Sequence, residues 1–161
     1  NYFPAVEKGL QEAVQKGVLA GYPVVGLKAT LVDGSYHPVD SSEMAFKTAA
    51  QLAYKAAMPQ ASPAILEPIG NLKVTVPDSY TGDIMGELNK RRGRVLGMEP
   101  AGKGLTTIES DVPMSEMGDF TTVLRSVTQG RGSFTLEFAR YELLPKQLEA
   151  KVIAESGSQA E

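Results

Sequence analysis

The chain has 161 residues, a net charge of −3 and no cysteine. Its length allows one domain or two small ones, and its mild charge does not indicate a nucleic-acid-binding protein as a whole. The lack of cysteine excludes disulfides and thiolate chemistry and fits a reducing compartment. No apolar run approaches the ~18 residues of a membrane span, and nothing resembles a signal peptide. The chain starts without methionine, next to a helical pattern, so we expect it to be truncated.

The first 60 residues alternate between helical and strand-like patterns. Apolar side chains at helical spacing predict a helix over residues 3–17, and strict alternation in VVGLKATLV predicts a half-buried strand over 23–32. The loop DGSYHPVD follows. Asp40 and Glu43 form a capping-box pattern that predicts the start of a helix over residues 42–57.

The proline-containing segment MPQASP (58–63) predicts a linker and a domain boundary. The order after it is βαββαβ: strand 66–76, helix 79–92, strands 94–100 and 105–112, helix 115–128 and strand 133–141. Both halves of this unit begin Gly-Asp and run through a helix and a glycine into a strand. They predict an α+β domain with two helices on one face of a four-stranded antiparallel sheet. Phe134 and Phe138 alternate with polar residues and are expected in the core. A short helix follows Pro145, and ESGSQAE (155–161) is expected to be disordered.

His37, the one histidine, lies in the loop after residue 32. Asp33, Asp40 and nearby serines are its only sequence neighbours of catalytic type. They are more simply turn and capping residues, and no oxyanion motif surrounds a serine, so a hydrolase is disfavoured. An exposed loop histidine without a special role remains open.

The cluster NKRRGR (89–94) has two interpretations. Cations at a helix C-terminus complement the helix dipole. Four positive charges in five positions also suit a phosphate-binding patch, which Arg125, Arg131 and Arg140 could extend. The turns at 102–104 and 130–132 fit no nucleotide-binding glycine motif.

Four segments together resemble bacterial elongation factor G: GVLAGYPVVGLKATLVDGSYHPVDSSEMAFKTAA, LEPI, GDIMGELNKRRGRVLGMEP and TQGRGSFTLEF. The resemblance covers the second half of that family's fourth domain and all of its fifth. It implies a partial α/β module with a left-handed βαβ crossover over residues 1–60, a ferredoxin-like fifth domain over 64–145, and a C-terminal tail over 146–161.

The resemblance also implies where the chain acts. The loop over residues 33–40, here called the tip loop, would enter the decoding region of the small ribosomal subunit: Asp33, Gly34, Ser35, Tyr36, His37, Pro38, Val39 and Asp40. Tyr36 and His37 suit stacking on, or hydrogen bonding to, exposed bases. The fifth domain would face the large subunit near the stalk base and the sarcin–ricin loop. The candidates for rRNA contact are Lys90, Arg91, Arg92, Arg94, Lys103, Arg125 and Arg131.

By the same resemblance, the parent is a cytoplasmic translational GTPase that promotes tRNA–mRNA translocation. GTP and magnesium belong to a nucleotide-binding domain that this chain lacks, so the chain itself is expected to be no enzyme and to hold no cofactor. Pro38 and Gly26 depart from common family residues. They leave open an elongation factor G-like paralogue in ribosome recycling or ribosomal protection, and a stand-alone ferredoxin-like module binding RNA or a ligand is the other alternative. An unpaired edge of strand 23–32 would permit self-association.

Overall fold

The computed structural model describes residues 1–158, and the chain forms two compact units. Unit 1 contains residues 1–65 together with the segment from Leu144, and unit 2 contains Leu66–Leu143. Within the described residues, no helix has the length and apolar character that crossing a membrane requires.

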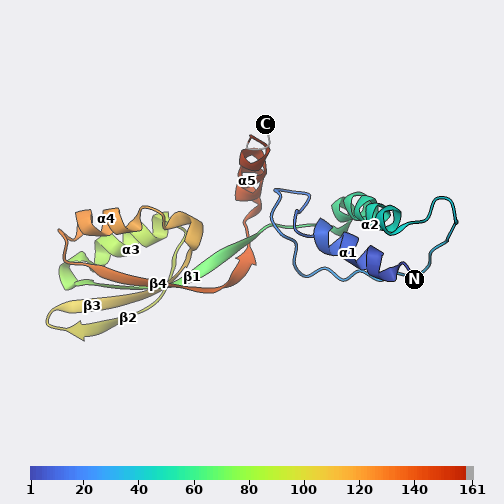
Figure 1. The fold of residues 1–161 in the computed structure, drawn as a ribbon. Helices are drawn as coiled ribbons and strands as arrows, with labels where there is room; N and C mark the ends of the chain where they lie inside the picture. The colour runs from blue at the N-terminus through green and yellow to red at the C-terminus, as the bar shows by residue number, and fades with distance from the viewer. Residues whose placement is uncertain (159–161) are drawn as a thin grey trace. The chain divides into compact units, whose positions relative to one another are not determined.

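Unit 2 is a four-stranded antiparallel sheet with helices on one face (Figure 1). Its strands are β1 (Leu66–Pro77), β2 (Arg94–Gly102), β3 (Leu105–Pro113) and β4 (Ser133–Leu143), in the order β2-β3-β1-β4. Two helices, α3 (Thr81–Lys90) and α4 (Phe120–Val127), each follow a short 3₁₀ turn, η2 (Asp78–Tyr80) and η3 (Met114–Glu116). The predicted α+β class and the antiparallel sheet are confirmed, and the strand order is consistent with a ferredoxin-like fold.

The core of unit 2 lies between the sheet and these helices. Leu72, Val74 and Val76 point to the same face of β1, since they alternate along the strand, and all three are fully buried. They pack against fully buried side chains that include Ile84 and Phe120. Each such side chain contributes about 1.5–3 kcal/mol by leaving water. Polar residues alternate with these β1 side chains and point to the opposite face of β1: Asn71, Lys73 and Thr75.

A β-bulge changes the alternation of β4. Opposite β1, Gly70 pairs with Phe138 and Ile69 pairs with Arg140, so Ala139 is the extra residue. Phe134 packs edge-on against Phe120 in the core, with ring centroids 5.0 Å apart. Phe138 is 53% exposed instead. The prediction that Phe138 lies in the core is therefore wrong: it faces the helix side of the sheet but is not covered there.

Unit 1 is built on a pair of packed helices, α1 (Phe3–Ala13) and α2 (Glu43–Ala57). They approach so closely at Gly9 that an added Cβ would lie 2.6 Å from the Lys47 carbonyl oxygen. A salt bridge of 2.6 Å from Lys47 to Glu12 joins the same two helices. The 3₁₀ turn η1 (Met58–Ala61) follows α2, where the sequence predicts a linker.

The helix predicted over residues 3–17 ends earlier, at Ala13. The chain folds back there, because the Val14 carbonyl accepts a hydrogen bond from the Val24 amide at 2.7 Å and the Gly17 amide donates to the Tyr22 carbonyl at 2.8 Å. These bonds replace those of a fourth helical turn.

The predicted half-buried strand over residues 23–32 is not formed. Nothing among residues 1–65 supplies a neighbouring strand, and a strand without a hydrogen-bonding ladder is not stable. Gly26 has a positive φ of 71°, which interrupts the extended path. Val25 and Leu31, which the alternation places on one face of a half-buried strand, are 71% and 48% exposed. The segment therefore crosses unit 1 as an irregular, open chain (Figure 1).

The last helix, α5 (Lys146–Ser158), extends further than expected. Residues 155–158 are helical rather than disordered. The remainder of the segment predicted to be disordered, 159–161, lies outside the described residues.

Candidate functional site

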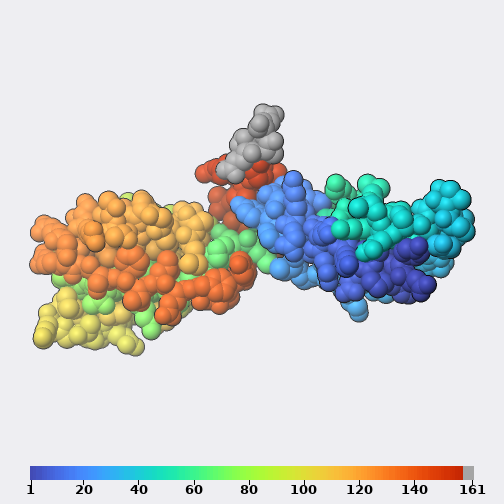
Figure 2. All heavy atoms as spheres, in the orientation of Figure 1, coloured from blue at the N-terminus to red at the C-terminus, as the bar shows by residue number. Residues whose placement is uncertain are grey.

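The tip loop joins the open segment 23–32 to the start of α2 and arches beyond the end of that helix (Figure 1). Every one of its residues, from Asp33 to Asp40, is exposed. In the space-filling view its cyan atoms lie at one end of unit 1 (Figure 2). All eight predicted loop residues therefore lie together on one accessible protrusion.

The backbone of His37 is fixed on both sides. Its amide donates to Ser41 Oγ at 2.9 Å, and its carbonyl accepts from the amides of Asp40 and Ser41 at 3.1 and 2.9 Å. This turn satisfies the polar backbone groups of His37 locally. The imidazole is exposed, so it is available to an external partner while its attachment point is held.

The prediction that Asp40 and Glu43 form the capping box of α2 is wrong. The N-cap of α2 is Ser42, whose hydroxyl accepts from the Ala45 amide at 3.1 Å. Asp40 lies two residues too early, inside the His37 turn. Glu43 pairs with Lys8 of α1 at 3.6 Å. Ser41 and Ser42 thus form the local hydrogen bonds that the sequence pattern assigned to Asp40 and Glu43.

Tyr36 is already stacked on a ring of its own chain. Its centroid lies 5.7 Å from that of Tyr2, with an angle of 18° between the ring planes. Tyr2 in turn stacks on Phe46 of α2 at 4.5 Å and 16°. Sequence reasoning missed Tyr2 and Phe46. The only available signal was an aromatic residue near the start of each helix, which does not show that the two meet.

Arg91 and Arg92, two of the candidates for rRNA contact, are bound within unit 2. Arg91 donates to Asp119 and to the Glu116 carbonyl, each at 2.6 Å, and its guanidinium lies 5.4 Å from the centroid of the Phe120 ring. The hydrogen bond to Asp119 raises the pKa of Arg91, and its counterpart lowers the pKa of Asp119. The hydrogen bond to buried Glu67 is the main cause that raises the pKa of Arg92.

Arg94 and Lys90 are more exposed and also paired. Arg94 and Arg140 both donate to Asp111, at 3.2 and 2.8 Å. Partial burial raises the pKa of Asp111, but these two hydrogen bonds outweigh it and leave the pKa below its ordinary value. Lys90 pairs with Glu87 at 3.3 Å. The NKRRGR cluster is therefore largely neutralised by carboxylates of its own unit.

The other three candidates lie at the opposite end of the sheet. Lys103 is in the turn before Leu105, which pairs with Pro77 at the end of β1, whereas Arg94 pairs with Asp111 of β3, which lies opposite the middle of β1. The turn that holds Arg131 leads into β4 at the same far end. The Arg125 carbonyl accepts from Gly130 of that turn at 2.9 Å. The structure thus divides the seven predicted residues into two groups.

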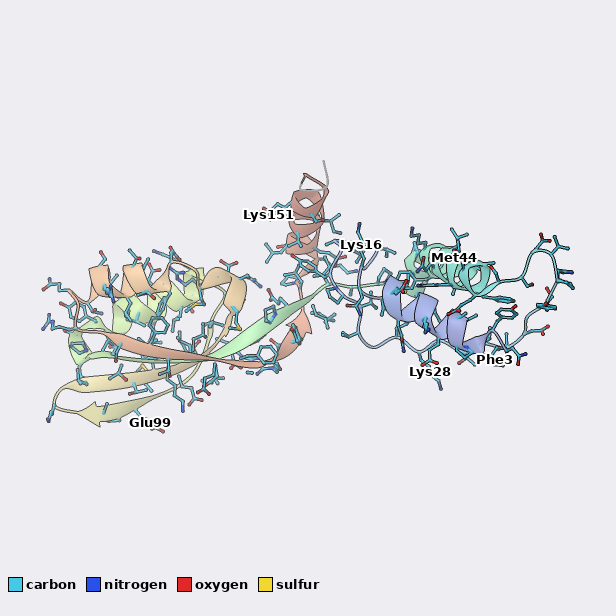
Figure 3. All side chains as sticks on the ribbon, viewed as in Figure 1. Phe3, Lys16, Lys28, Met44, Glu99 and Lys151 are labelled. Atoms are coloured by element: carbon cyan, nitrogen blue, oxygen red, sulfur yellow. The ribbon has the colours of Figure 1, made fainter. Side chains whose placement is uncertain are left out.

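The cations of this second group are exposed and have fewer charged partners within the described residues. Within residues 1–158, Lys103 and Arg125 form no salt bridge. Arg131 stacks over the Tyr80 ring at 5.2 Å and donates to its hydroxyl at 2.6 Å. Edge strand β2, which carries the labelled Glu99, leads into the turn of Lys103 (Figure 3). We call Lys103, Arg125 and Arg131 the basic end of unit 2.

Comparison with known protein families identifies both units as C-terminal domains of a translation factor. Residues 1–62 match the family description "Elongation factor G, domain IV", and residues 64–152 match "Elongation factor G C-terminus". The chain therefore belongs to the elongation factor G family and corresponds to the end of its fourth domain and to its fifth.

Individual relatives agree with this assignment. An elongation factor G-like protein of Thermotoga maritima is 52% identical over 155 residues, which is 96% of this chain and 23% of that protein. A crystal structure of a Thermus thermophilus protein matches with a TM-score of 0.85 and 45% identity, over 98% of this chain and 24% of that one. The chain thus spans about a quarter of the length of these relatives.

Proposed function

We propose that this chain is the ribosome-binding C-terminal part of a translational GTPase that promotes tRNA–mRNA translocation. The observation that carries the proposal is the tip loop, whose backbone is fixed at His37 while the imidazole is open to solvent. The tip loop enters the decoding region of the small subunit, and unit 2 contacts large-subunit rRNA near the stalk base and the sarcin–ricin loop.

The chain's role is mechanical rather than chemical. GTP hydrolysis, with its magnesium ion, belongs to a separate nucleotide-binding domain of the full-length cytoplasmic factor. The tip loop then occupies the space behind the moving tRNA–mRNA pair and prevents its return. An imidazole can hydrogen-bond to bases and riboses without the unspecific attraction of a full positive charge to every phosphate.

The functional test uses a full-length elongation factor G that carries this sequence as its C-terminal part. His37→Ala is expected to slow tRNA–mRNA movement while leaving ribosome-stimulated GTP hydrolysis largely intact. Lys55→Ala, which changes an exposed residue of α2 in the same unit, serves as the control. Equal loss of movement and hydrolysis would point to a docking or folding defect and would contradict the proposed role of His37.

For large-subunit rRNA we propose the basic end of unit 2 as the contact. Its cations are exposed, and Lys103 and Arg125 have no carboxylate partner within the described residues, whereas Arg91 and Arg92 stabilise the fold. Removing one cation–phosphate pair should reduce the slope of log affinity against log salt by about 1. Lys103→Ala with Arg125→Ala should therefore weaken ribosome binding and lower that slope by roughly 2. Lys73→Ala, on the open face of β1, is the matched control, and an unchanged slope in the double variant would refute the assignment.

We propose the same domain boundaries as the sequence predicts, with a fourth-domain part over 1–60, a fifth domain over 64–145 and a tail over 146–161. Segment 23–32 would become a strand of the left-handed βαβ module once it meets a neighbouring strand. A second copy of the chain could supply one, because Val25 and Leu31 are exposed and the segment has no ladder. Sedimentation at high protein concentration tests this, and a strictly monomeric species would contradict self-association.

Two alternatives make different predictions. A paralogue in ribosome recycling or ribosomal protection would bind ribosomes without accelerating translocation. A stand-alone ferredoxin-like module would bind RNA through exposed rings of β4. Phe138 and Tyr141 are exposed and 5.1 Å apart, but Phe134 is packed in the core. Phe138→Ala would abolish RNA binding only under that second alternative.

A further inference from the structure

Three aromatic rings from separate segments of unit 1 form a continuous stack. Tyr36 belongs to the tip loop, Tyr2 precedes α1, and Phe46 lies in the first turns of α2. The ring planes differ by only 18° and 16° at the two contacts. Such parallel contacts between aromatic rings stabilise beyond the burial of their area.

The inner members of the stack are firmly placed. The Tyr2 carbonyl accepts from the amides of Ala5 and Val6, which makes Tyr2 part of the start of α1. Phe46 follows the Ser42 cap, whose carbonyl it binds at 3.1 Å. The two helices are locked together at Gly9 and by the Lys47–Glu12 salt bridge. The stack therefore connects an exposed loop to the packed helix pair of unit 1.

We propose that Tyr36 is a positioning residue, which acts through Tyr2 and Phe46 to set the direction in which His37 leaves the loop. Tyr36 and His37 are consecutive in sequence, so holding the Tyr36 ring against Tyr2 restricts the backbone from which the imidazole of His37 projects. The ring face that meets Tyr2 is already occupied within the chain. This inference rests on the proposed function of the tip loop and assigns the base-contacting role to His37 rather than to Tyr36.

A double-mutant cycle distinguishes positioning from direct contact. In the full-length factor, Tyr2→Leu and Tyr36→Leu should each slow translocation by about 2- to 12-fold, the range expected for loss of one aromatic pair. The double variant should be no slower than the slower single variant, because both changes break the same contact. Tyr2→Phe and Tyr36→Phe retain the rings and should preserve the rate. GTP hydrolysis should stay unchanged in all five variants.

The 161-residue chain supplies an independent structural readout. Nuclear Overhauser effects between the Tyr2 and Tyr36 rings should be present in the wild type. Amide order parameters over residues 34–40 should fall in Tyr2→Leu and stay high in Tyr2→Phe. If Tyr2→Leu disturbs α1, Tyr36→Leu provides the same test, because it removes only the outer ring and keeps the contact of Tyr2 with Phe46.

The outcomes separate this inference from the proposed function. Two results would overturn the positioning role and make Tyr36 a direct contact. In the first, the rate decrease of the double variant equals the product of the decreases in Tyr2→Leu and Tyr36→Leu. In the second, Tyr36→Leu slows translocation and Tyr2→Leu does not. If His37→Ala slows translocation, and Tyr2→Leu loosens the tip loop without slowing translocation, the positioning role is refuted and the proposed function stands. If His37→Ala itself has no effect, the proposed function fails and the positioning role fails with it.

Discussion

Arg92 and Glu67 are joined by two parallel hydrogen bonds, each 2.9 Å long, between one guanidinium and one carboxylate. Glu67 lies in β1 and is buried, and Arg92 follows α3 with a positive φ of 60°. A bidentate pair of this kind is both strong and directional. It explains why an arginine occupies a backbone conformation that usually favours glycine, and it ties the end of α3 to the sheet.

Loss of this pair should destabilise unit 2 strongly. Arg92→Ala leaves the buried Glu67 carboxylate without its partner, which costs about 3–5 kcal/mol in the free energy of unfolding. Urea titration followed by amide resonances of unit 2 measures the change. Lys90→Ala, an exposed neighbour in the same basic cluster, should stay within about 0.5 kcal/mol. Similar small losses in both variants would show that the pair contributes little.

Asp111 should make unit 2 sensitive to acid. Its hydrogen bonds from Arg140 and Arg94 hold its pKa below the ordinary value when folded, so the unfolded chain binds the proton more readily. The stabilisation is complete above the unfolded pKa of about 3.9 and is lost as the pH falls through the lower folded pKa. Asp111→Asn should be less stable at neutral pH, with a flatter stability profile below about pH 4. An unaltered acid profile would exclude Asp111 as the titrating group.

Gly9 should not tolerate a methyl group. The Cβ of Gly9→Ala would lie 2.6 Å from the Lys47 carbonyl oxygen and 3.1 Å from Ala50 Cβ, so α1 must move away from α2. Overpacking costs about 1–3 kcal/mol, against a gain of about 1 kcal/mol in helix propensity. Gly86→Ala is the matched control, since it is also helical but its Cβ meets nothing within 4 Å. It should stabilise α3. Comparable stabilisation in both variants, measured by thermal unfolding, would contradict the close approach at Gly9.

Ser42, rather than Asp40, should matter for the start of α2. Ser42→Ala removes the hydroxyl that caps the Ala45 amide and should cost about 1 kcal/mol. Asp40→Ala should change the stability of α2 by less than about 0.5 kcal/mol. Thr48→Ala, at an exposed position of the same helix, should be neutral or slightly stabilising. Hydrogen exchange of the first amides of α2 reports the cap directly, and faster exchange in Asp40→Ala than in Ser42→Ala would reverse the assignment.

Unit 2 was predictable because its local patterns and its tertiary partners lie within one stretch of sequence. Strand β1 was expected over 66–76 and spans 66–77, and α3 lies within the predicted 79–92. The helix predicted over 115–128 starts too early, because the chain first forms the 3₁₀ turn η3 and α4 begins only at Phe120. The position of Phe138 was not predictable, because alternation cannot show a bulge. The partners of Arg91 and Arg92 were not predictable either, since Glu67 and Asp119 are distant in sequence.

In unit 1, by contrast, the local sequence pattern was not sufficient to predict the structure. Segment 23–32 has a clear strand pattern, yet a strand exists only when another strand pairs with it, and residues 1–65 provide none. The exposure of the tip loop followed from its turn-forming residues. The contact of Tyr36 with Tyr2 depends on how two helices bring separate segments together, and no local pattern contains that information.

The bulge at Ala139 reverses the parity of the outer third of β4. Before it, even-numbered residues face the helices; after it, odd-numbered residues do, so Phe138 and Tyr141 share one side and Arg140 reaches Asp111 on the other. Removing Ala139 would join two stretches of ladder that are already in register with β1. A shortening by one residue should therefore be easier to accommodate there than at any neighbouring position of the strand, where it would invert every side chain beyond the cut.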